Sequence, residues 1–283
     1  MNKKGLVFLL IFPVALHLFS LFFLHFNERF SPRDFSHGFR EEYITDVEGL
    51  NTEQLDPIFA QPFHYLGRGK QMVALESADG KYVIKLFNPM RPQKRQWYRR
   101  WDLWKRYSSL KWISREWFQK KARLAKLFKR HKIAFEHLQN ETGLLFVHLA
   151  PSEKVIHYLH MTDEKGKNHI LTLADTPFVL QKKAILVPSY LQSLIEKGEE
   201  AKAEEAIHKL ENLFAKRLAL GISDRIQTMH NNYGFVGDEP IQIDVGRINI
   251  EEEFLENPEK EQARLVDNLH MWVDTRFPNL DVR

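Results

Sequence analysis

The pattern of hydrophobic and polar positions divides the chain into an apolar N-terminal stretch and a mixed remainder. In the remainder, short apolar runs bounded by turn residues predict strands. Three such strands, separated by two turns, are predicted in Tyr65–Phe87, and further strands around a turn in Val155–Ala184. Single strands are predicted at Thr142–Leu149, Tyr233–Val236 and Ile241–Val245. Apolar residues at helical spacing predict a helix over Glu199–Leu220, which Gly221 ends, and a second helix after Asn257 and Pro258. The pattern therefore predicts a mixed α+β protein.

The apolar stretch Gly5–Phe26 holds 22 residues and contains no Asp, Glu, Lys or Arg. A helix of that length spans about 33 Å, which is enough to cross the hydrocarbon core of a bilayer. We therefore expect residues 1–26 to form an uncleaved, single-pass membrane anchor. A cleaved signal peptide is the alternative, although no small-x-small cleavage site follows the stretch. Basic residues flank it on both sides, so the sequence leaves the side of the membrane undetermined.

Residues 27–61 are polar and weakly periodic, and they are predicted to form a juxtamembrane connector. Further along, Arg91–Lys132 carries 16 Lys and Arg residues against two acidic residues, and it holds five of the six Trp. A basic and aromatic helix suits the surface of an anionic membrane, whereas a Trp-lined core face with a solvated basic rim is the alternative. Single-stranded nucleic acid is a less favoured partner, because no nucleic-acid-binding motif accompanies the segment.

Composition narrows the range of possible functions only a little. The 283 residues are 43% hydrophobic and 28% charged, which is typical of a globular protein with one sizeable domain or two lobes. The absence of cysteine excludes disulfides, thiolate zinc sites and cysteine nucleophiles.

Candidate chemistry is concentrated in Gly221–Arg247, where a predicted hairpin carries acidic residues at both ends. Asp224 precedes the first strand, Asn232 lies directly before it, and Asp244 lies at the close of the second strand. A short hairpin can bring two carboxylates and an amide within reach of one cation. Oxygen ligands of this kind suit Mg²⁺, which is often shared with substrate phosphates.

A second group of candidate residues lies upstream, in the predicted strands of Tyr65–Phe87. Gly67 and Gly69 form a Gly-rich turn, and Lys85 lies inside the last apolar run of this segment. Glycines without a Cβ allow the backbone amides to approach a phosphate closely.

In this order of motifs the chain resembles the protein-kinase-like superfamily, from Tyr65 to Arg247. The resemblance implies a bilobal α+β fold that binds ATP and Mg²⁺. It matches Asn232 and Asp244-Val245-Gly246 to the metal-binding Asn and Asp-Phe-Gly of the family, and Asp224 to the residue that positions the acceptor hydroxyl. The chain departs from the family pattern in that no His-Arg pair precedes Asp224, and the gap from Asp224 to Asn232 is longer.

The same resemblance assigns roles to the upstream segment. Gly67 and Gly69 would cover the phosphates, Lys85 would bind them, and Glu116 would orient Lys85. Val83 would line the slot for the base. The residues after Arg247 are too few for the peptide-substrate platform of a full protein kinase, so a small-molecule, lipid or glycan hydroxyl is the expected acceptor.

The sequence therefore predicts a membrane-anchored, bilobal protein-kinase-like fold with an N-terminal transmembrane helix. Its parts would be an anchor (1–26), a connector (27–61), an N-lobe (62–150) and a reduced C-lobe (151–283). The expected activity is ATP- and Mg²⁺-dependent phosphotransfer. A pseudokinase that binds nucleotide, and a membrane-associated interaction module without catalysis, are the alternatives.

Overall fold

The computed structural model of the chain describes residues 49–69, 71–87, 110–150, 157–224 and 226–280, together with residues 35, 43–45, 47 and 155. In the helix that begins at Leu110, side chains are described from Arg123 on. The predicted anchor at Gly5–Phe26 lies outside the described residues. So do residues 91–109 of the basic segment and most of the predicted connector before residue 49.

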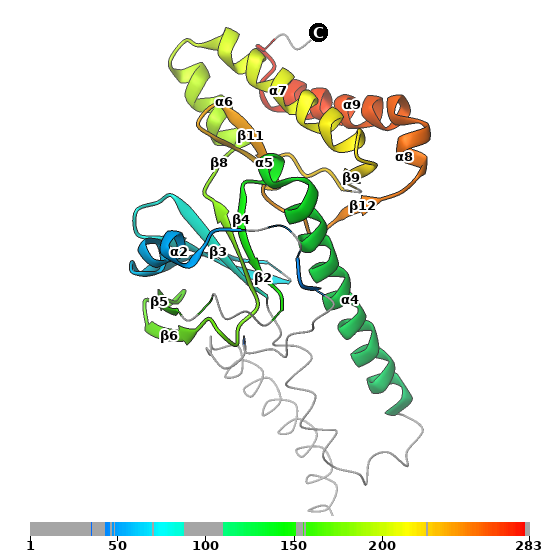
Figure 1. The fold of residues 1–283 in the computed structure, drawn as a ribbon. Coiled ribbons are helices and arrows are strands. Elements are labelled where there is room, and N and C mark those ends of the chain that lie inside the picture. Colours follow the sequence, from blue (N-terminus) through cyan, green and yellow to red (C-terminus); the bar gives the residue numbers. More distant parts are fainter. Residues whose placement is uncertain are drawn as a thin grey trace, which may run out of the picture.

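A seven-stranded sheet forms one half of the described structure (Figure 1). In spatial order its strands are β4 (Leu144–His148), β7 (Phe178–Lys182), β3 (Tyr82–Phe87), β2 (Met72–Ser77), β1 (Phe63–Arg68), β5 (Tyr158–Thr162) and β6 (Asn168–Thr172). Neighbouring strands are antiparallel, except that β1 and β5 are parallel. The sheet thus takes strands from both sides of residue 150, where the sequence predicts the boundary between two lobes.

Helix α2 (Thr52–Phe59) covers one face of this sheet, although the sequence analysis assigned its residues to a connector. The side chain of Asn51 accepts a hydrogen bond from the backbone N–H of Gln54, and the Gln54 side chain accepts one from the backbone N–H of Asn51. This capping box satisfies two backbone amides that a helix otherwise leaves unpaired at its start. Three residues of α2 then pack with the strands in one buried cluster: Leu55, Ile58 and Phe59.

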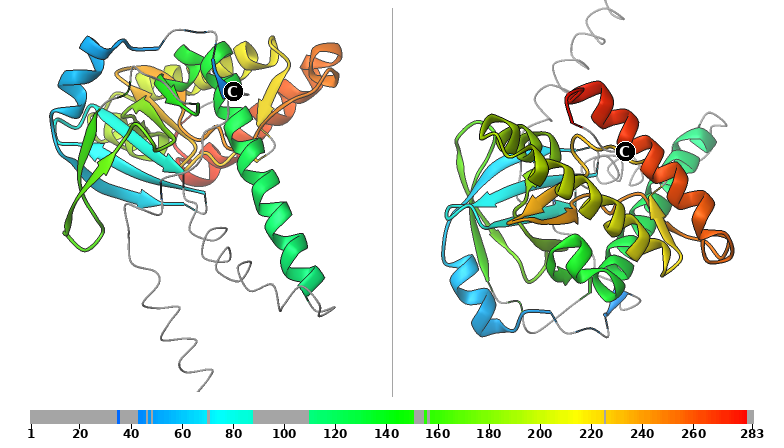
Figure 2. Two further views of the ribbon diagram at one scale, coloured as in Figure 1. Left: turned by 60° about the horizontal axis from the view of Figure 1, so that its bottom comes forward. Right: turned by 90° about the horizontal axis from the view of Figure 1, so that it is seen from above.

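The opposite face of the sheet packs against the C-terminal half of helix α4 (Leu110–His137). Phe128 and Phe135 of α4 share a buried cluster with Phe87 of β3 and Val179 of β7. The N-terminal turns of α4 extend away from the strands (Figure 2, left). The end of α4 that is packed against the sheet is therefore its C-terminal end.

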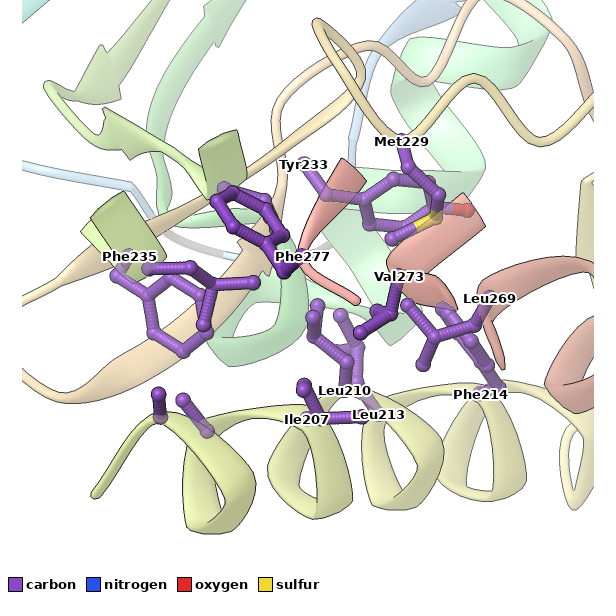
Figure 3. Close-up of a cluster of buried hydrophobic side chains, with 14 of the residues drawn as sticks. Ile207, Leu210, Leu213, Phe214, Met229, Tyr233, Phe235, Leu269, Val273 and Phe277 are labelled. Carbon is purple, nitrogen blue, oxygen red and sulfur yellow. The ribbon is translucent and has the colours of Figure 1, made fainter. Parts of the chain in front are cut away.

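The other half of the structure consists mainly of helices α6 (Val187–Glu196), α7 (Glu200–Leu218) and α9 (Pro258–Arg276). They pack with a three-stranded sheet of order β11 (Glu239–Gln242), β10 (Tyr233–Val236) and β8 (Ile185–Leu186). Figure 3 shows the shared core, in which Leu210 and Phe214 of α7 meet Leu269 and Val273 of α9.

Four short elements lie between the longer ones in the described residues. Strands β9 (Ile222–Asp224) and β12 (Ile248–Ile250) pair with each other, and α5 (Gln139–Thr142) and α8 (Glu253–Glu256) are single turns. Gly221, which follows α7, has a φ of +69°, so the predicted left-handed helix end is confirmed. The predicted helix that begins at Pro258 is also confirmed.

The predicted fold class and membrane localisation require correction. The structure shows a mixed α+β protein built on a curled seven-stranded sheet. For the described residues, the predicted bilobal kinase-like fold with an N-terminal transmembrane helix is therefore wrong. None of the helices formed by the described residues combines the length and the hydropathy needed to cross a membrane. The described residues therefore do not support the predicted single-pass membrane localisation.

Candidate functional site

A row of small side chains crosses the sheet on the face that carries Lys85. The register pairs Gly67 of β1 with Ala74 of β2, Ala74 with Lys85 of β3, and Lys85 with Val179 of β7. Directly opposed residues lie on the same face of a sheet. Gly67 and Ala74 are both partly exposed, so the face beside the Lys85 side chain is open on the β1 and β2 side.

Lys85 bridges the sheet and the segment that carries Asp244. Its Nζ donates a hydrogen bond of 2.5 Å to the backbone oxygen of Ile243, the residue before Asp244. Burial lowers the pKa of Lys85 to about 8, and the Asp244 carboxylate opposes this shift. Val83, two residues earlier on the same face of β3, is buried.

The turn Asp244–Gly246 is held by its own carboxylate and by neighbouring elements. The backbone N–H of Gly246 donates to Asp244 Oδ1 at 2.8 Å, while Asp244 remains exposed. A Cβ on Gly246 would lie 3.0 Å from that oxygen and 3.3 Å from Gln71 Oε1 and from a Leu127 methyl carbon. The turn between β1 and β2, which carries Gln71, therefore approaches the Asp244–Gly246 turn closely.

Helix α4 contacts the same turn near its C-terminal end. Arg130 donates from Nη1 to the backbone oxygen of Gly246 at 2.6 Å. His131 is buried, and burial lowers its pKa to about 4. Glu116 lies 14 residues before Arg130 on α4, which corresponds to about 21 Å along the helix axis. The side chain of Glu116 lies outside the described part of α4, so its pairing with Lys85 stays a prediction.

Asn232 and Asp244 have neighbouring backbones. The backbone oxygen of Asn232 accepts hydrogen bonds from the N–H of Ile243 at 2.7 Å and from that of Asp244 at 3.4 Å. The Asn232 side chain donates from Nδ2 to the Ile226 oxygen at 3.5 Å, so its Oδ1 atom is the part that can bind a cation. An amide oxygen and a carboxylate fit Mg²⁺.

The described residues include no group of three or more His, Cys, Asp or Glu side chains that could hold a metal ion. If Asn232 and Asp244 bound a magnesium ion, phosphate and water would have to supply its other ligands. Mg²⁺ is commonly bound in this way in proteins that act on phosphates.

Asp224 is fully buried and is held by other side chains of the hairpin. Its Oδ2 accepts hydrogen bonds from the Tyr233 hydroxyl at 3.2 Å and from Gln242 Nε2 at 3.3 Å. Its Oδ1 accepts from the Ile226 N–H at 3.2 Å. Burial raises the pKa of Asp224, and the nearby Arg217 guanidinium opposes this shift.

The predicted phosphate-covering glycines are not required by packing. A Cβ on Gly67 would meet no atom within 4 Å, and one on Gly69 would meet the Met72 oxygen at an ordinary 3.7 Å. Neither residue is among the glycines with a positive φ. Packing therefore tolerates a side chain at both positions, although Gly67 lies at the register shift that follows Tyr65 in β1, where a glycine is common.

Three site residues were missed by the sequence analysis: Arg217, Tyr233 and Gln242. Arg217 was detectable, because it interrupts the apolar stripe of α7 three positions after Phe214 and four after Leu213. A charged residue on such a stripe is buried only if it has partners. Tyr233 and Gln242 gave no comparable signal, since strands commonly carry both residue types.

Comparison with known proteins gives little guidance. No family model and no curated protein matches the chain. Among solved structures, the complex of Rv3197 with erythromycin from Mycobacterium tuberculosis is 14% identical, with a TM-score of 0.34 over 97% of this chain and 75% of that one. A likeness at this level carries no argument about fold or function, and it does not confirm the protein-kinase-like superfamily.

Proposed function

We propose that the chain binds ATP with Mg²⁺ beside Lys85 and Asp244 and transfers the terminal phosphoryl group to a hydroxyl of a small molecule, lipid or glycan. One observation carries this proposal. The Lys85 ammonium binds the backbone oxygen of Ile243, directly before Asp244. Lys85 also lies beside Gly67 and Ala74, which are partly exposed on the same face of the sheet. A cation, a carboxylate and a stretch of backbone with small or no side chains are the groups that a metal-bound phosphate needs.

Each residue has a role that follows from its chemistry. With a pKa of about 8, Lys85 is mostly protonated at neutral pH and can neutralise phosphate charge. Asn232 and Asp244 would hold the metal, which supplies charge stabilisation to the transferring group. The order of these residues along the chain is also the basis of the resemblance to the protein-kinase-like superfamily.

In the transfer step, a bond forms between the acceptor oxygen and the terminal phosphorus, while the bond from that phosphorus to the bridging oxygen breaks. The products are ADP and a phosphorylated acceptor, and the hydroxyl proton passes to the Asp224 carboxylate. Most of the rate enhancement in reactions of this class comes from positioning and charge stabilisation.

A second candidate function is nucleotide binding without transfer. The observation that favours it is the complete burial of Asp224, whose carboxylate is already bound by Tyr233, Gln242 and the backbone of Ile226. An acceptor hydroxyl reaches this carboxylate only if one of those hydrogen bonds is exchanged. Binding at Lys85 and Asp244 needs no such exchange.

Thermal denaturation with and without Mg²⁺-ATP tests both candidates. A ligand at 100 times its Kd adds about 2.7 kcal/mol to the free energy of unfolding, which raises the melting temperature by roughly 5–10 °C for a protein of this size. The variant Asp244→Asn keeps the Oδ1 acceptor for Gly246 and removes the charge. It should keep its melting temperature without ligand and lose most of the Mg²⁺-dependent rise.

The matched control is Asp267→Asn, which removes one carboxylate from the exposed surface of α9. Its ligand-induced rise should equal that of the wild type. If wild-type protein shows no rise with ATP, ADP or GTP in the presence of Mg²⁺, the nucleotide-site proposal is wrong. If ATP binds but is not consumed with any class of hydroxyl acceptor, the second candidate replaces the first.

A further inference from the structure

Arg217 is a fully buried arginine at the C-terminal end of α7, directly behind the candidate site. Its guanidinium carbon lies 5.3 Å from the centre of the Phe214 ring and 5.6 Å from that of the Tyr233 ring. One nitrogen, Nη1, donates both to the Tyr233 hydroxyl at 3.1 Å and to Gln242 Oε1. Nε and Nη2 have no hydrogen-bond partner among the described residues. A buried charge with so few hydrogen bonds is costly to stability.

These hydrogen bonds fix the direction of the whole network. The Tyr233 hydroxyl has one proton, and because it accepts from Arg217 it gives that proton to Asp224 Oδ2. Gln242 presents its oxygen to Arg217, so its Nε2 donates to Asp224 Oδ2 and to the backbone oxygen of Asp244. Arg217 therefore orients both donors toward Asp224, and its charge opposes the rise in the pKa of Asp224 that burial causes.

The two bridging residues lie at the open end of the hairpin. Tyr233 is the first residue of β10, Gln242 is the last residue of β11, and the two are cross-strand partners. Asn232 directly precedes this pair, and Asp244 follows two residues after it. Any change in the separation or twist of the Tyr233–Gln242 pair is thus passed to both candidate metal ligands.

The pair is also fixed to the large sheet. Gln181 of β7 donates from Nε2 to the backbone oxygen of Gln242 at 3.4 Å, and Lys85 of β3 donates to the next carbonyl, that of Ile243. The seven-stranded sheet therefore holds this strand end from one side, and Arg217 holds it from the other.

We propose that Arg217 is a positioning residue for the metal site: through Tyr233 and Gln242 it sets the separation of Asn232 and Asp244. This inference rests on the proposed function, because it assigns a role at the same site. Side chains that orient metal ligands without touching the metal commonly change metal affinity by about 10- to 100-fold when they are replaced. Arg217 would act in this way through Tyr233 and Gln242, without touching the metal itself.

The test separates metal affinity from stability. Binding of a fluorescent, non-hydrolysable ATP analogue is followed by anisotropy while Mg²⁺ is titrated, and again in EDTA. Tyr233→Phe removes one hydroxyl and keeps the ring. Arg217→Lys keeps the positive charge but loses the planar guanidinium group that donates to Tyr233 and Gln242. Both variants should raise the Mg²⁺ concentration at half-maximal binding by about tenfold or more. Metal-free binding of the analogue, which depends on Lys85, should stay within about twofold of the wild type.

Thr176→Val is the matched control, because it also removes the hydroxyl of a fully buried residue. Thr176 lies in the loop before β7, and its hydroxyl donates to the backbone oxygen of Thr172, the last residue of β6. It should lower the melting temperature as Tyr233→Phe does, but leave the Mg²⁺ midpoint unchanged. If Tyr233→Phe and every folded Arg217 variant also keep the wild-type Mg²⁺ midpoint, the network only stabilises the fold. The proposal for Arg217 is then wrong, while the proposed function stands. If the wild type itself shows no Mg²⁺-dependent binding, the proposed function and this inference fail together.

Discussion

The ammonium group of Lys85 donates a hydrogen bond to the backbone oxygen of Ile243, across 158 positions of sequence. This contact connects the central part of the seven-stranded sheet to the hairpin that carries Asn232 and Asp244. It also places a cation in a partly buried setting, next to one exposed carboxylate. The contact therefore has consequences for both stability and ligand binding.

Replacing Lys85 by Met should change how stability depends on pH. The pKa of Lys85 is lowered from 10.5 to about 8 in the folded protein, so between these values the unfolded chain binds more protons than the folded one. The free energy of unfolding of the wild type should therefore rise, relative to Lys85→Met, as the pH increases from about 8 towards 10.5. Urea denaturation of both proteins at pH 7, 8, 9 and 10 measures this difference.

The control for this measurement is Lys209→Met. A hydrogen bond to Asp238 raises the pKa of Lys209 to about 12, so its protonation differs between folded and unfolded states only above pH 10. Its stability difference from the wild type should be constant from pH 7 to 10. A constant difference for Lys85→Met as well would contradict the burial of a charged Lys85. Lys85→Met should in addition lose the rise in melting temperature that Mg²⁺-ATP produces.

A pair of glycine replacements distinguishes a position needed by a ligand from one needed by the fold. Gly67→Ala should leave stability unchanged or raise it by about 0.4–1 kcal/mol, because the new Cβ meets no atom within 4 Å. It should nevertheless weaken ATP binding, since the methyl group lies on the row beside Lys85. Calorimetric unfolding and nucleotide titration of the same protein sample measure the two effects separately.

Gly234→Ala is the opposite case. A Cβ at Gly234 would lie 2.5 Å from the Ile185 backbone oxygen, and backbone atoms on two paired strands cannot move apart without breaking β8 from β10. We expect a loss of stability of about 1–3 kcal/mol, typical of overpacking. If Gly234→Ala were as stable as Gly67→Ala, β8 and β10 would not pair as described. If Gly67→Ala bound nucleotide as tightly as the wild type, Gly67 would not belong to the site.

Local patterns in the sequence predicted many elements of the fold correctly. The strands in Tyr65–Phe87, the helix before Gly221 and the helix after Asn257 follow from periodicity, turn residues and capping residues, which act over a few positions. Helix α2 was missed because its stripe is short, although the capping box at Asn51 and Gln54 is visible in the sequence. The parallel pairing of β1 with β5 has no local signal, since it joins segments about 100 residues apart.

The candidate site was predictable only in part, for a related reason. The adjacency of Lys85 and Asp244 was inferred from a resemblance in motif order and not from the residues themselves. The burial of Asp224 depends on Arg217, Tyr233 and Gln242, which come from a helix and two strands. Such a network arises from tertiary packing, so the sequence alone does not indicate which polar residues a buried carboxylate will meet.

His131 should make the protein sensitive to acid. Burial lowers its pKa from 6.5 to about 4, with Lys85 and Arg130 adding to the shift, while the hydrogen bond between its Nδ1 and the Leu127 oxygen opposes it. Between pH 6.5 and 4 the unfolded chain binds more protons, so the wild type should lose stability as the pH falls through this range. The loss from this residue can reach about 3 kcal/mol. His131→Phe keeps an aromatic ring beside Phe87 and removes the titrating group.

Denaturation curves at pH 7, 6, 5 and 4.5 compare His131→Phe with the wild type. The variant should lose less stability than the wild type as the pH falls, because its phenyl ring does not bind a proton on unfolding. His64→Gln, which removes an exposed imidazole from β1, is the control and should follow the wild-type curve. Parallel curves for wild type and His131→Phe would mean that His131 is protonated as easily in the folded protein as in the unfolded chain. In that case α4 would not pack against the Asp244–Gly246 turn as tightly as the structure shows.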